Sequence, residues 1–411
     1  MTRYGGFRST NHSSSRGPAW CAGLMIFSAV CVGFSQAPAD GQEPSAPQSI
    51  ALPQFQAAID RLGDLDYETR TTASRTIRRT EAPEAVPALL RAVAEHRDGY
   101  VRYRALVLLT GFNDPRTTDA MRESLASPND RLRTVAYSFF EHNPDARMVP
   151  DLLAAMDKEQ AEFVRPALVR ALAALGADPR VQPVLAREAT RGEDFFRSAV
   201  IEALGDYRAQ YAFDAVVAIA KLDGPLQDDA ATALGKIGDK RALETLAALQ
   251  QGAPRVRQPS IAAAICLLGV NCAAHEQYLI ETLKFANQNP GYQDLLRAAA
   301  AGLGALGLRD RTTAIEALFE VGIPSRDPAR APIALALATI ALRNTVLAIP
   351  LLEKHAARAE ATALLAEGFD MLEEDLEKER FFAFARRTYW ASPENGSARE
   401  LMQTLIARLD F

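Results

Sequence analysis

The sequence has few of the residues on which catalytic and metal sites are usually built. Among its 411 residues there are 4 cysteines, 5 histidines and 2 tryptophans. It contains no His-Glu-x-x-His zinc motif, no Gly-x-Ser-x-Gly nucleophile turn and no phosphate-binding loop that ends in Gly-Lys-Ser/Thr. We therefore predict no catalytic residue, no metal site and no cofactor, and we expect the chain not to be an enzyme.

An excess of basic charge is also lacking. Lysine and arginine number 46 against 51 aspartates and glutamates, which gives a formal net charge of −5. Proteins that bind nucleic acid neutralise its phosphates with basic side chains. We therefore expect no nucleic acid partner.

Long hydrophobic runs are missing as well, and the longest uncharged apolar run covers residues 19–34. These 16 residues are fewer than the roughly 20 that cross a bilayer as a helix. Basic residues precede the run and an Ala-Pro-Ala sequence follows it at 37–39, as in a signal peptide. The basic residues are Arg3, Arg8 and Arg16.

The N-terminal pattern predicts a signal peptide at residues 1–39, a disordered linker at 40–52 and an exported protein, periplasmic or secreted. After removal of the signal, no segment is expected to span a membrane. Two alternatives stay open: an uncleaved membrane anchor, and a chance pattern on a cytosolic protein.

Two cysteines, Cys266 and Cys272, remain outside the signal, six residues apart. Because an exported protein meets an oxidising compartment, and because Gly269 and Asn271 could bend the chain between them, these cysteines could form a disulfide. Two free buried thiols are the alternative. No second cysteine pair or histidine cluster completes a metal site.

The remaining composition favours helices, since 48% of residues are hydrophobic, 24% are charged and only 7% are aromatic. A local pattern returns at intervals of 30 to 38 residues from an anchor position that is most often arginine. The third residue after each anchor is small or apolar and the seventh is large and apolar, which marks one helix face. The anchors are Arg70, Arg102, Arg133, Arg165, Arg197, Gln227, Gln258, Leu296 and Arg330.

A second apolar set with helical spacing lies between successive anchors, for example Leu243, Leu246 and Leu249. Each period therefore contains two helices, and no window has the alternation of a strand. Acidic residues precede several anchors, so we interpret the anchors as a ladder of charged hydrogen bonds between repeats.

Segments such as 196–206 (FRSAVIEALGD) and 230–239 (AATALGKIGD) resemble the HEAT family, especially the bacterial short-repeat branch called PBS-lyase HEAT-like. The resemblance covers residues 53–365 and implies an all-α solenoid, a right-handed superhelix of about nine helix pairs. Residues 366–411 fit the period poorly and are predicted to form a helical C-terminal cap. The resemblance also implies a scaffold that binds protein, with a chromophore lyase or lyase subunit, or a cytosolic adaptor, as alternatives.

Two short patterns suggest chemistry but have simpler explanations. Residues 302–307 match a dinucleotide-binding Gly-x-Gly-x-x-Gly, yet they continue a helical repeat, so we attribute these glycines to close helix packing. Some HEAT-like hydroxylases hold two irons with several His-Glu pairs, whereas this chain has the single pair His275-Glu276.

In HEAT-like solenoids the second helix of each pair lines the concave surface. Its outward positions carry arginines and aromatic residues in the first four repeats, a composition typical of protein-binding hot spots. We predict that this row binds an acidic or extended protein segment, with a merely solvated face as the alternative. The row comprises Arg75, Arg79, Tyr103, Arg104, Tyr137, His142 and Arg170.

Near the C-terminus, residues 367–379 contain seven acids and one lysine, which predicts an exposed acidic helix. The aromatic residues that follow are predicted to form a hydrophobic lid on the last repeat. They are Phe381, Phe382, Phe384, Tyr389 and Trp390.

Overall fold

The structure is a computed structural model that describes residues 46–372, 374–409 and 411. The predicted signal peptide at 1–39 and residues 40–45 of the predicted linker lie outside these residues. The described part contains 22 α-helices and no β-strand beyond one isolated bridge, so the prediction of an all-α solenoid is confirmed. None of the described helices is long and apolar enough to cross a membrane.

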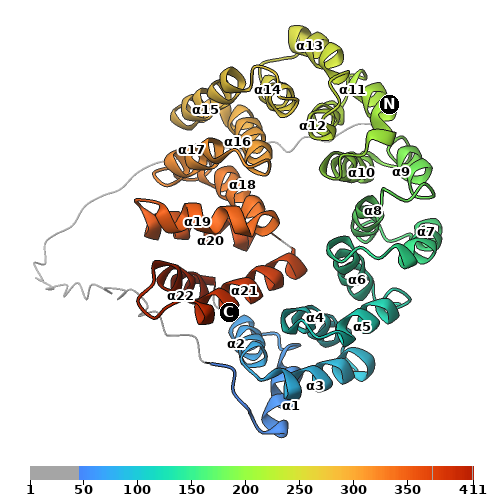
Figure 1. The fold of residues 1–411 in the computed structure, drawn as a ribbon, viewed down its shortest axis with the longest axis vertical. Helices are drawn as coiled ribbons and strands as arrows, with labels where there is room; N and C mark the ends of the chain where they lie inside the picture. The colour runs from blue at the N-terminus through green and yellow to red at the C-terminus, as the bar shows by residue number, and fades with distance from the viewer. Residues whose placement is uncertain (1–45, 373, 410) are drawn as a thin grey trace, which may run out of the picture. The chain divides into compact units, whose positions relative to one another are not determined.

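The helices follow one another as antiparallel pairs (Figure 1). The first helices of the pairs are α1 (Leu52–Arg61), α3 (Ala82–Glu95), α5 (Arg116–Ser124), α7 (Val149–Lys158), α9 (Gln182–Glu188), α11 (Phe213–Ala220), α13 (Ala242–Gly252), α15 (Cys272–Gln288), α17 (Thr312–Gly322), α19 (Thr345–Lys354) and α21 (Asp375–Ala391). The second helices are α2 (Tyr67–Arg78), α4 (Gly99–Leu109), α6 (Asp130–His142), α8 (Arg165–Ala174), α10 (Asp194–Asp206), α12 (Gln227–Ile237), α14 (Gln258–Leu267), α16 (Gln293–Gly307), α18 (Arg330–Arg343), α20 (Arg358–Met371) and α22 (Ser397–Leu409). Short 3-10 turns join some of them: η1 (Thr110–Phe112), η2 (Ala146–Met148), η3 (Gln210–Ala212) and η4 (Pro290–Tyr292).

The nine predicted pairs correspond to α1 through α18, and the structure adds α19 with α20 as a tenth pair. The predicted cap boundary at residue 366 therefore falls inside α20, and the segment beyond the regular stack is α21 with α22. The predicted linker differs at its end too. The backbone of Gln48 pairs with Arg79 and Glu81 (N···O 2.7 and 3.2 Å), so this part of the linker is hydrogen-bonded to the end of α2.

The anchor side chains close the ends of the preceding helices. The Nε of Arg102 donates to the carbonyl of Val93 at 2.7 Å, and the amide of Gln258 donates to the carbonyl of Gln250 at 2.8 Å. The last carbonyls of a helix have no donor within the helix, so these side chains satisfy them. Glutamine can thus replace arginine at an anchor.

Three anchors also reach a carboxylate of the next pair, as predicted for the charged ladder. These ion pairs are Arg133–Glu159 (2.7 Å), Arg165–Glu188 (3.3 Å) and Arg330–Glu367 (2.5 Å). The anchors therefore have two uses: they cap a helix within one pair and, at these three positions, connect it to the following pair.

Glycine permits close approach between second helices of neighbouring pairs. A Cβ atom on Gly235 of α12 would lie 2.5 Å from the Cα of Ala264 in α14. The three glycines at 302, 304 and 307 lie inside α16, and a Cβ on Gly307 would lie 2.7 Å from the Cδ1 of Ile340. Helix packing, rather than a dinucleotide, accounts for this Gly-x-Gly-x-x-Gly pattern.

We expect Gly235→Ala to lower the free energy of unfolding by about 1–3 kcal/mol, because the added methyl forces α12 and α14 apart. Gly252→Ala is the matched control: it also adds a methyl to a helix, yet nothing lies within 4 Å of that position. Urea unfolding of both variants measures the difference. Equal stability of the two variants would contradict the packing argument.

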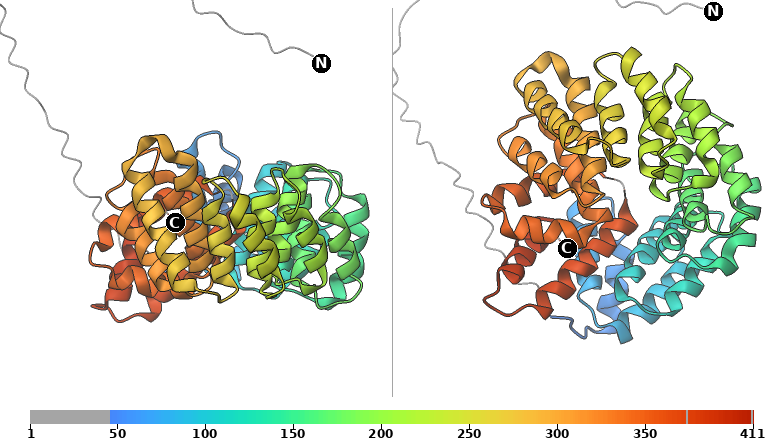
Figure 2. Two further views of the ribbon diagram at one scale, coloured as in Figure 1. Left: turned by 90° about the horizontal axis from the view of Figure 1, so that it is seen from above. Right: turned by 45° about the horizontal axis from the view of Figure 1, so that its top comes forward.

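Within the described residues, the C-terminal end of the helix stack contacts its N-terminal end. The sequence did not predict this closure. Helix α21 contacts α4, η1 and α6, so the C-terminal pair lies beside the N-terminal pairs (Figures 1 and 2). Its Leu376 packs into the hydrophobic core of the N-terminal half, and its Phe381 packs into that of the C-terminal half. Helix α21 thus joins the two cores and encloses the concave face.

Candidate functional site

The acidic start of α21 lies against the predicted binding row. The Nη1 of Arg104 donates to the Oδ2 of Asp375 at 3.0 Å, and the hydroxyl of Tyr103 donates to the same carboxylate. The Nε2 of His142 lies 3.1 Å from the Oε1 of Glu377. An acidic segment does occupy this face, and it belongs to the same chain.

The pKa values at this contact follow from burial and charge. Burial raises the pKa of Tyr103 above its ordinary value, and the neighbouring Asp375 raises it further. Burial acts to raise the pKa of Asp375, but Arg104 outweighs it, and the pKa lies below its ordinary value. The pKa of Glu377 is lowered in the same way, because the hydrogen bond from His142 outweighs burial. Both carboxylates are therefore ionised at neutral pH.

The most buried ion pair of the closure, Arg78 with Glu379, was not predicted from the sequence. The Nε of Arg78 donates to both carboxylate oxygens of Glu379 (3.0 and 2.9 Å), and its Nη2 donates to Oε2 at 2.7 Å. The two side chains are 8% and 3% exposed. The sequence contains an arginine-rich α2 and an acid-rich segment at 367–379, but the two partners are 301 positions apart, so their pairing could not be predicted.

The predicted exposed acidic helix is wrong in part: residues 367–379 are divided between α20, where Glu367 and Asp370 are exposed, and α21, where the acids are not. Glu379 is buried, whereas Asp375 and Glu377 are half-buried against the N-terminal pairs. The like charges do not repel one another into solvent, because arginines of other helices neutralise them. The aromatic segment behaves as predicted at Phe381 and Tyr389, which are buried in the C-terminal core.

Other members of the predicted row have different surroundings. Arg75 and Arg79 lie at the end of α2, on either side of Arg78 in the sequence and half-buried. The prediction for Tyr137 is corrected, because this side chain is buried near Arg133 and Glu159 and does not lie on the concave row. Four residues past an anchor, the helix face turns into the core of its own pair.

Arg170, the last member of the row, is held by a polar network. Its Nε donates to Glu141 at 2.8 Å and its Nη1 donates to Asp206 at 3.0 Å. Lys236 donates to Asp206 at 2.7 Å, and the hydroxyl of Tyr207 donates to Glu141 at 2.9 Å. Burial acts to raise the pKa of Asp206, but Lys236 and Arg170 outweigh it and hold the pKa at about 2.

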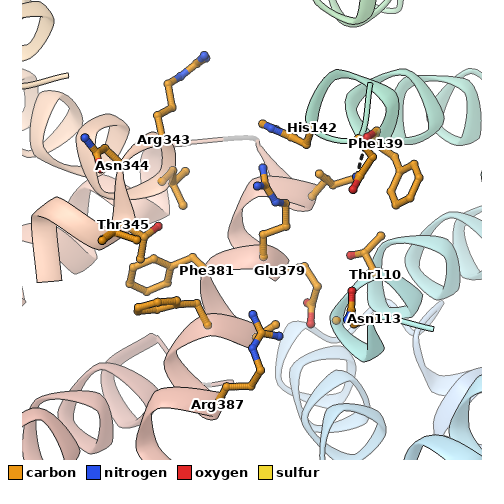
Figure 3. A pocket seen from close by; sticks show the side chains of 18 of the residues that line it. Thr110, Asn113, Phe139, His142, Arg343, Asn344, Thr345, Glu379, Phe381 and Arg387 are labelled. Carbon is orange, nitrogen blue, oxygen red and sulfur yellow. Dashed lines mark hydrogen bonds between the residues drawn. The ribbon is translucent and has the colours of Figure 1, made fainter. Parts of the chain in front are cut away.

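A cavity of about 1590 Å³ lies between α21 and the concave ends of the repeats. Side chains of α6, η1, α18 and α21 line it, among them His142, Thr110, Arg343 and Arg387 (Figure 3). Its lining includes eight arginine and lysine side chains and three carboxylates. The cavity is therefore locally positive in a chain whose formal net charge is −5.

One cluster of metal-ligating groups adjoins this cavity, at Glu141, His142 and Glu377. Their ligand atoms lie within 4.8 Å of one another. Glu141 already accepts hydrogen bonds from Arg170 and Tyr207, and His142 is bonded to Glu377. A divalent cation would have to displace these donors beside a guanidinium, so we interpret the cluster as part of the charge network.

Cys266 and Cys272 form a disulfide. It connects the last turn of α14 to the first residue of α15, across the turn that contains Gly269 and Asn271 in left-handed conformations. This bridge lies at the predicted pair of cysteines, on a different part of the stack from the cavity.

Two protein-family models match parts of the chain: HEAT repeats at residues 55–139 and the PBS lyase HEAT-like repeat at residues 226–252. None of the curated proteins compared with the chain matches it. Similar solved structures include the complex of CpcE and CpcF of phycocyanin lyase from Nostoc sp. PCC7120, with 19% identity over 63% of this chain and 97% of that chain and a TM-score of 0.40. Importin beta has 12% identity over 87% of this chain and 58% of that chain, with a TM-score of 0.36.

Proposed function

Because the chain belongs to the HEAT-repeat family, we propose that it is an extracytoplasmic scaffold that binds a partner protein on its concave side. The observation that carries the proposal is the cavity on the concave side, which combines exposed arginines with aromatic side chains. Arginine and aromatic residues dominate the binding energy of many protein interfaces.

The partner surface differs from the row first predicted, because α21 covers Tyr103, Arg104 and His142. The surface left to a partner is the cavity and its rim, where α21 contributes Arg387 and Trp390. Trp390 is 40% exposed, which is high for a tryptophan in a folded protein. Such a side chain can insert into a partner.

The extracytoplasmic part of the proposal is supported by the signal-like pattern at 1–39 and by the disulfide between Cys266 and Cys272, since disulfides persist in oxidising compartments. N-terminal sequencing of the mature protein tests it. A mature chain that starts near residue 40 supports cleavage and export, whereas a chain in the cytosolic fraction that keeps residues 1–39 favours the cytosolic adaptor.

We expect a photoreactive phenylalanine analogue at position 390 to cross-link the partner in native envelope fractions, because this residue lines the cavity and is exposed. The same analogue at position 65 is the control, since Leu65 is 98% exposed but lies outside the cavity. Mass spectrometry of the cross-linked species measures the result. Equal cross-linking from both positions, or from position 65 alone, contradicts a concave binding site.

The match of the PBS lyase HEAT-like repeat model at 226–252 favours a second candidate, a lyase-type enzyme or enzyme subunit that acts on a protein-bound chromophore. An absorbance scan of the protein purified from its native source discriminates between the two. A bound pigment supports the lyase class, and a colourless protein that retains its partner supports the scaffold.

A further inference from the structure

Helix α21 carries three arginines that form no ion pair with a carboxylate of the described residues. Arg380, Arg386 and Arg387 all line the cavity, and none forms an ion pair with a described carboxylate. In contrast, the acids in the first half of the same helix are paired with Arg104, His142 and Arg78. The imbalance therefore concerns one stretch of one helix.

Arg386 shows the imbalance most clearly. Its Nη1 is buried and has no hydrogen-bond partner among the described residues, which is costly for a charged group. Burial and the nearby charges of Arg79 and Arg78 together lower the pKa of Arg386 to about 10. A single carboxylate, Glu379, opposes these arginines, and it is already bonded to Arg78.

Arg380 and Arg387 face the cavity as a pair of exposed contact points. They are seven residues apart on α21, which places them on one helix face about 10 Å apart along the axis. Phe384 lies between them, four residues after Arg380 and three before Arg387, and it also lines the cavity. An apolar ring is thus flanked by two guanidinium groups (the position of Arg387 is shown in Figure 3).

Across the cavity, α18 contributes Arg343, which pairs with Asp206 and Glu374 at 3.5 and 3.7 Å, and the turn after α16 contributes Arg309. The guanidinium of Arg309 donates to the backbone carbonyl of Lys236 at 2.7 Å and has no described carboxylate within ion-pair distance. Burial lowers its pKa, and the charge of Arg208 lowers it further. The wall opposite α21 therefore adds one guanidinium without an ion pair among the described residues, that of Arg309.

From this arrangement we propose that the cavity binds a small organic dianion, with two phosphate or carboxylate groups on an apolar or aromatic body. Arg380 and Arg387 each bind one acidic group, because a guanidinium pairs with either oxyanion through two hydrogen bonds. Phe384 contacts the apolar body of the ligand, and Arg386 adds positive charge from the α21 wall of the cavity. The site lies in the same cavity as the proposed partner surface, but binding of the dianion requires no protein partner.

Isothermal titration calorimetry with biphenyl-4,4′-dicarboxylate tests the proposal on the purified mature protein at fixed ionic strength. The neutral biphenyl-4,4′-dimethanol has the same body without charge. We expect the dicarboxylate to bind, the diol to bind at least tenfold more weakly, and the affinity for the dicarboxylate to fall as salt is raised. Pyrophosphate, which has two acidic groups without the apolar body, is expected to bind more weakly than the dicarboxylate.

We expect the double variant Arg380→Gln/Arg387→Gln to bind the dicarboxylate at least about tenfold more weakly, since both charge-assisted contacts are lost. Both arginines are exposed, so circular dichroism is expected to show an unchanged fold. Arg91→Gln, which removes an exposed arginine on α3 away from the cavity, is the matched control with unchanged affinity.

Arg386→Gln gives a separate readout. It is expected to weaken binding while leaving the thermal stability of the unliganded protein equal or higher, because it removes a buried charge without a partner. The proposal is overturned if the diol binds as tightly as the dicarboxylate, or if the double variant binds like the Arg91→Gln protein. It is also overturned if an acidic peptide binds in the cavity and the dicarboxylate does not.

Discussion

Glu379→Ala is expected to lower the free energy of unfolding by about 3–5 kcal/mol, the usual cost of removing one partner of a buried ion pair. The guanidinium of Arg78 makes three hydrogen bonds to this carboxylate and is 8% exposed, so it cannot regain water without opening the contact between α2 and α21. Urea unfolding measures the loss, and hydrogen exchange shows whether the amides of α21 lose protection first.

The matched control is Glu320→Ala, which removes a carboxylate from the exposed pair Lys284–Glu320 (43% and 67% exposed). Solvent screens such a pair, and we expect a change below about 0.5 kcal/mol. The double variant Arg78→Met/Glu379→Leu is expected to recover most of the lost stability, since an apolar pair of similar volume needs no charge partner. A loss below about 1 kcal/mol in Glu379→Ala would mean that the closure contributes little to the folded state.

Asp206→Asn is expected to cost about 2 kcal/mol at pH 7, and this difference from the wild-type protein should disappear toward pH 2. The pKa of Asp206 is about 2 in the folded protein and 3.8 ordinarily. A carboxyl with a lowered folded pKa stabilises the fold above its unfolded pKa, and this contribution is lost as the pH falls through the folded pKa. The difference between a pKa of about 2 in the folded protein and 3.8 in the unfolded chain corresponds to about 2 kcal/mol.

The measurement is urea unfolding of both proteins between pH 7 and pH 2, read as a difference at each pH. Other carboxylates titrate in both proteins, so the difference isolates position 206. Asp375 and Glu377 also have lowered pKa values, and the wild-type closure is expected to weaken over the same acidic range. A difference that stays constant down to pH 2 would contradict the role given to Lys236 and Arg170.

The repeat architecture could be predicted from the sequence because its causes are local. An anchor such as Arg102 hydrogen-bonds to Val93, nine residues away, and the apolar residues three and seven positions later bury one face of the same helix. The same set of short-range contacts recurs in each pair. An error in the predicted helices of one repeat therefore does not change the prediction for the others.

The site was predicted only in part. The sequence indicated a basic, aromatic row and an acidic segment. It predicted that the row binds an outside partner and that the acidic segment is exposed to solvent. Tyr137 was placed on the row because composition, unlike helix phase, did not distinguish it from Tyr103. One position of helix rotation, about 100°, separates a concave side chain from a buried one.

What the sequence by itself determined is the helix pair and its stacking, since each depends on residues within about 40 positions of one another. Only the tertiary structure decided that the stack closes and where a cavity forms. The small rotation between neighbouring pairs accumulates over ten pairs before α21 reaches α2 and α6. No local pattern encodes that sum, so the pairing of Arg78 with Glu379 and the unbalanced arginines of α21 became visible only in three dimensions.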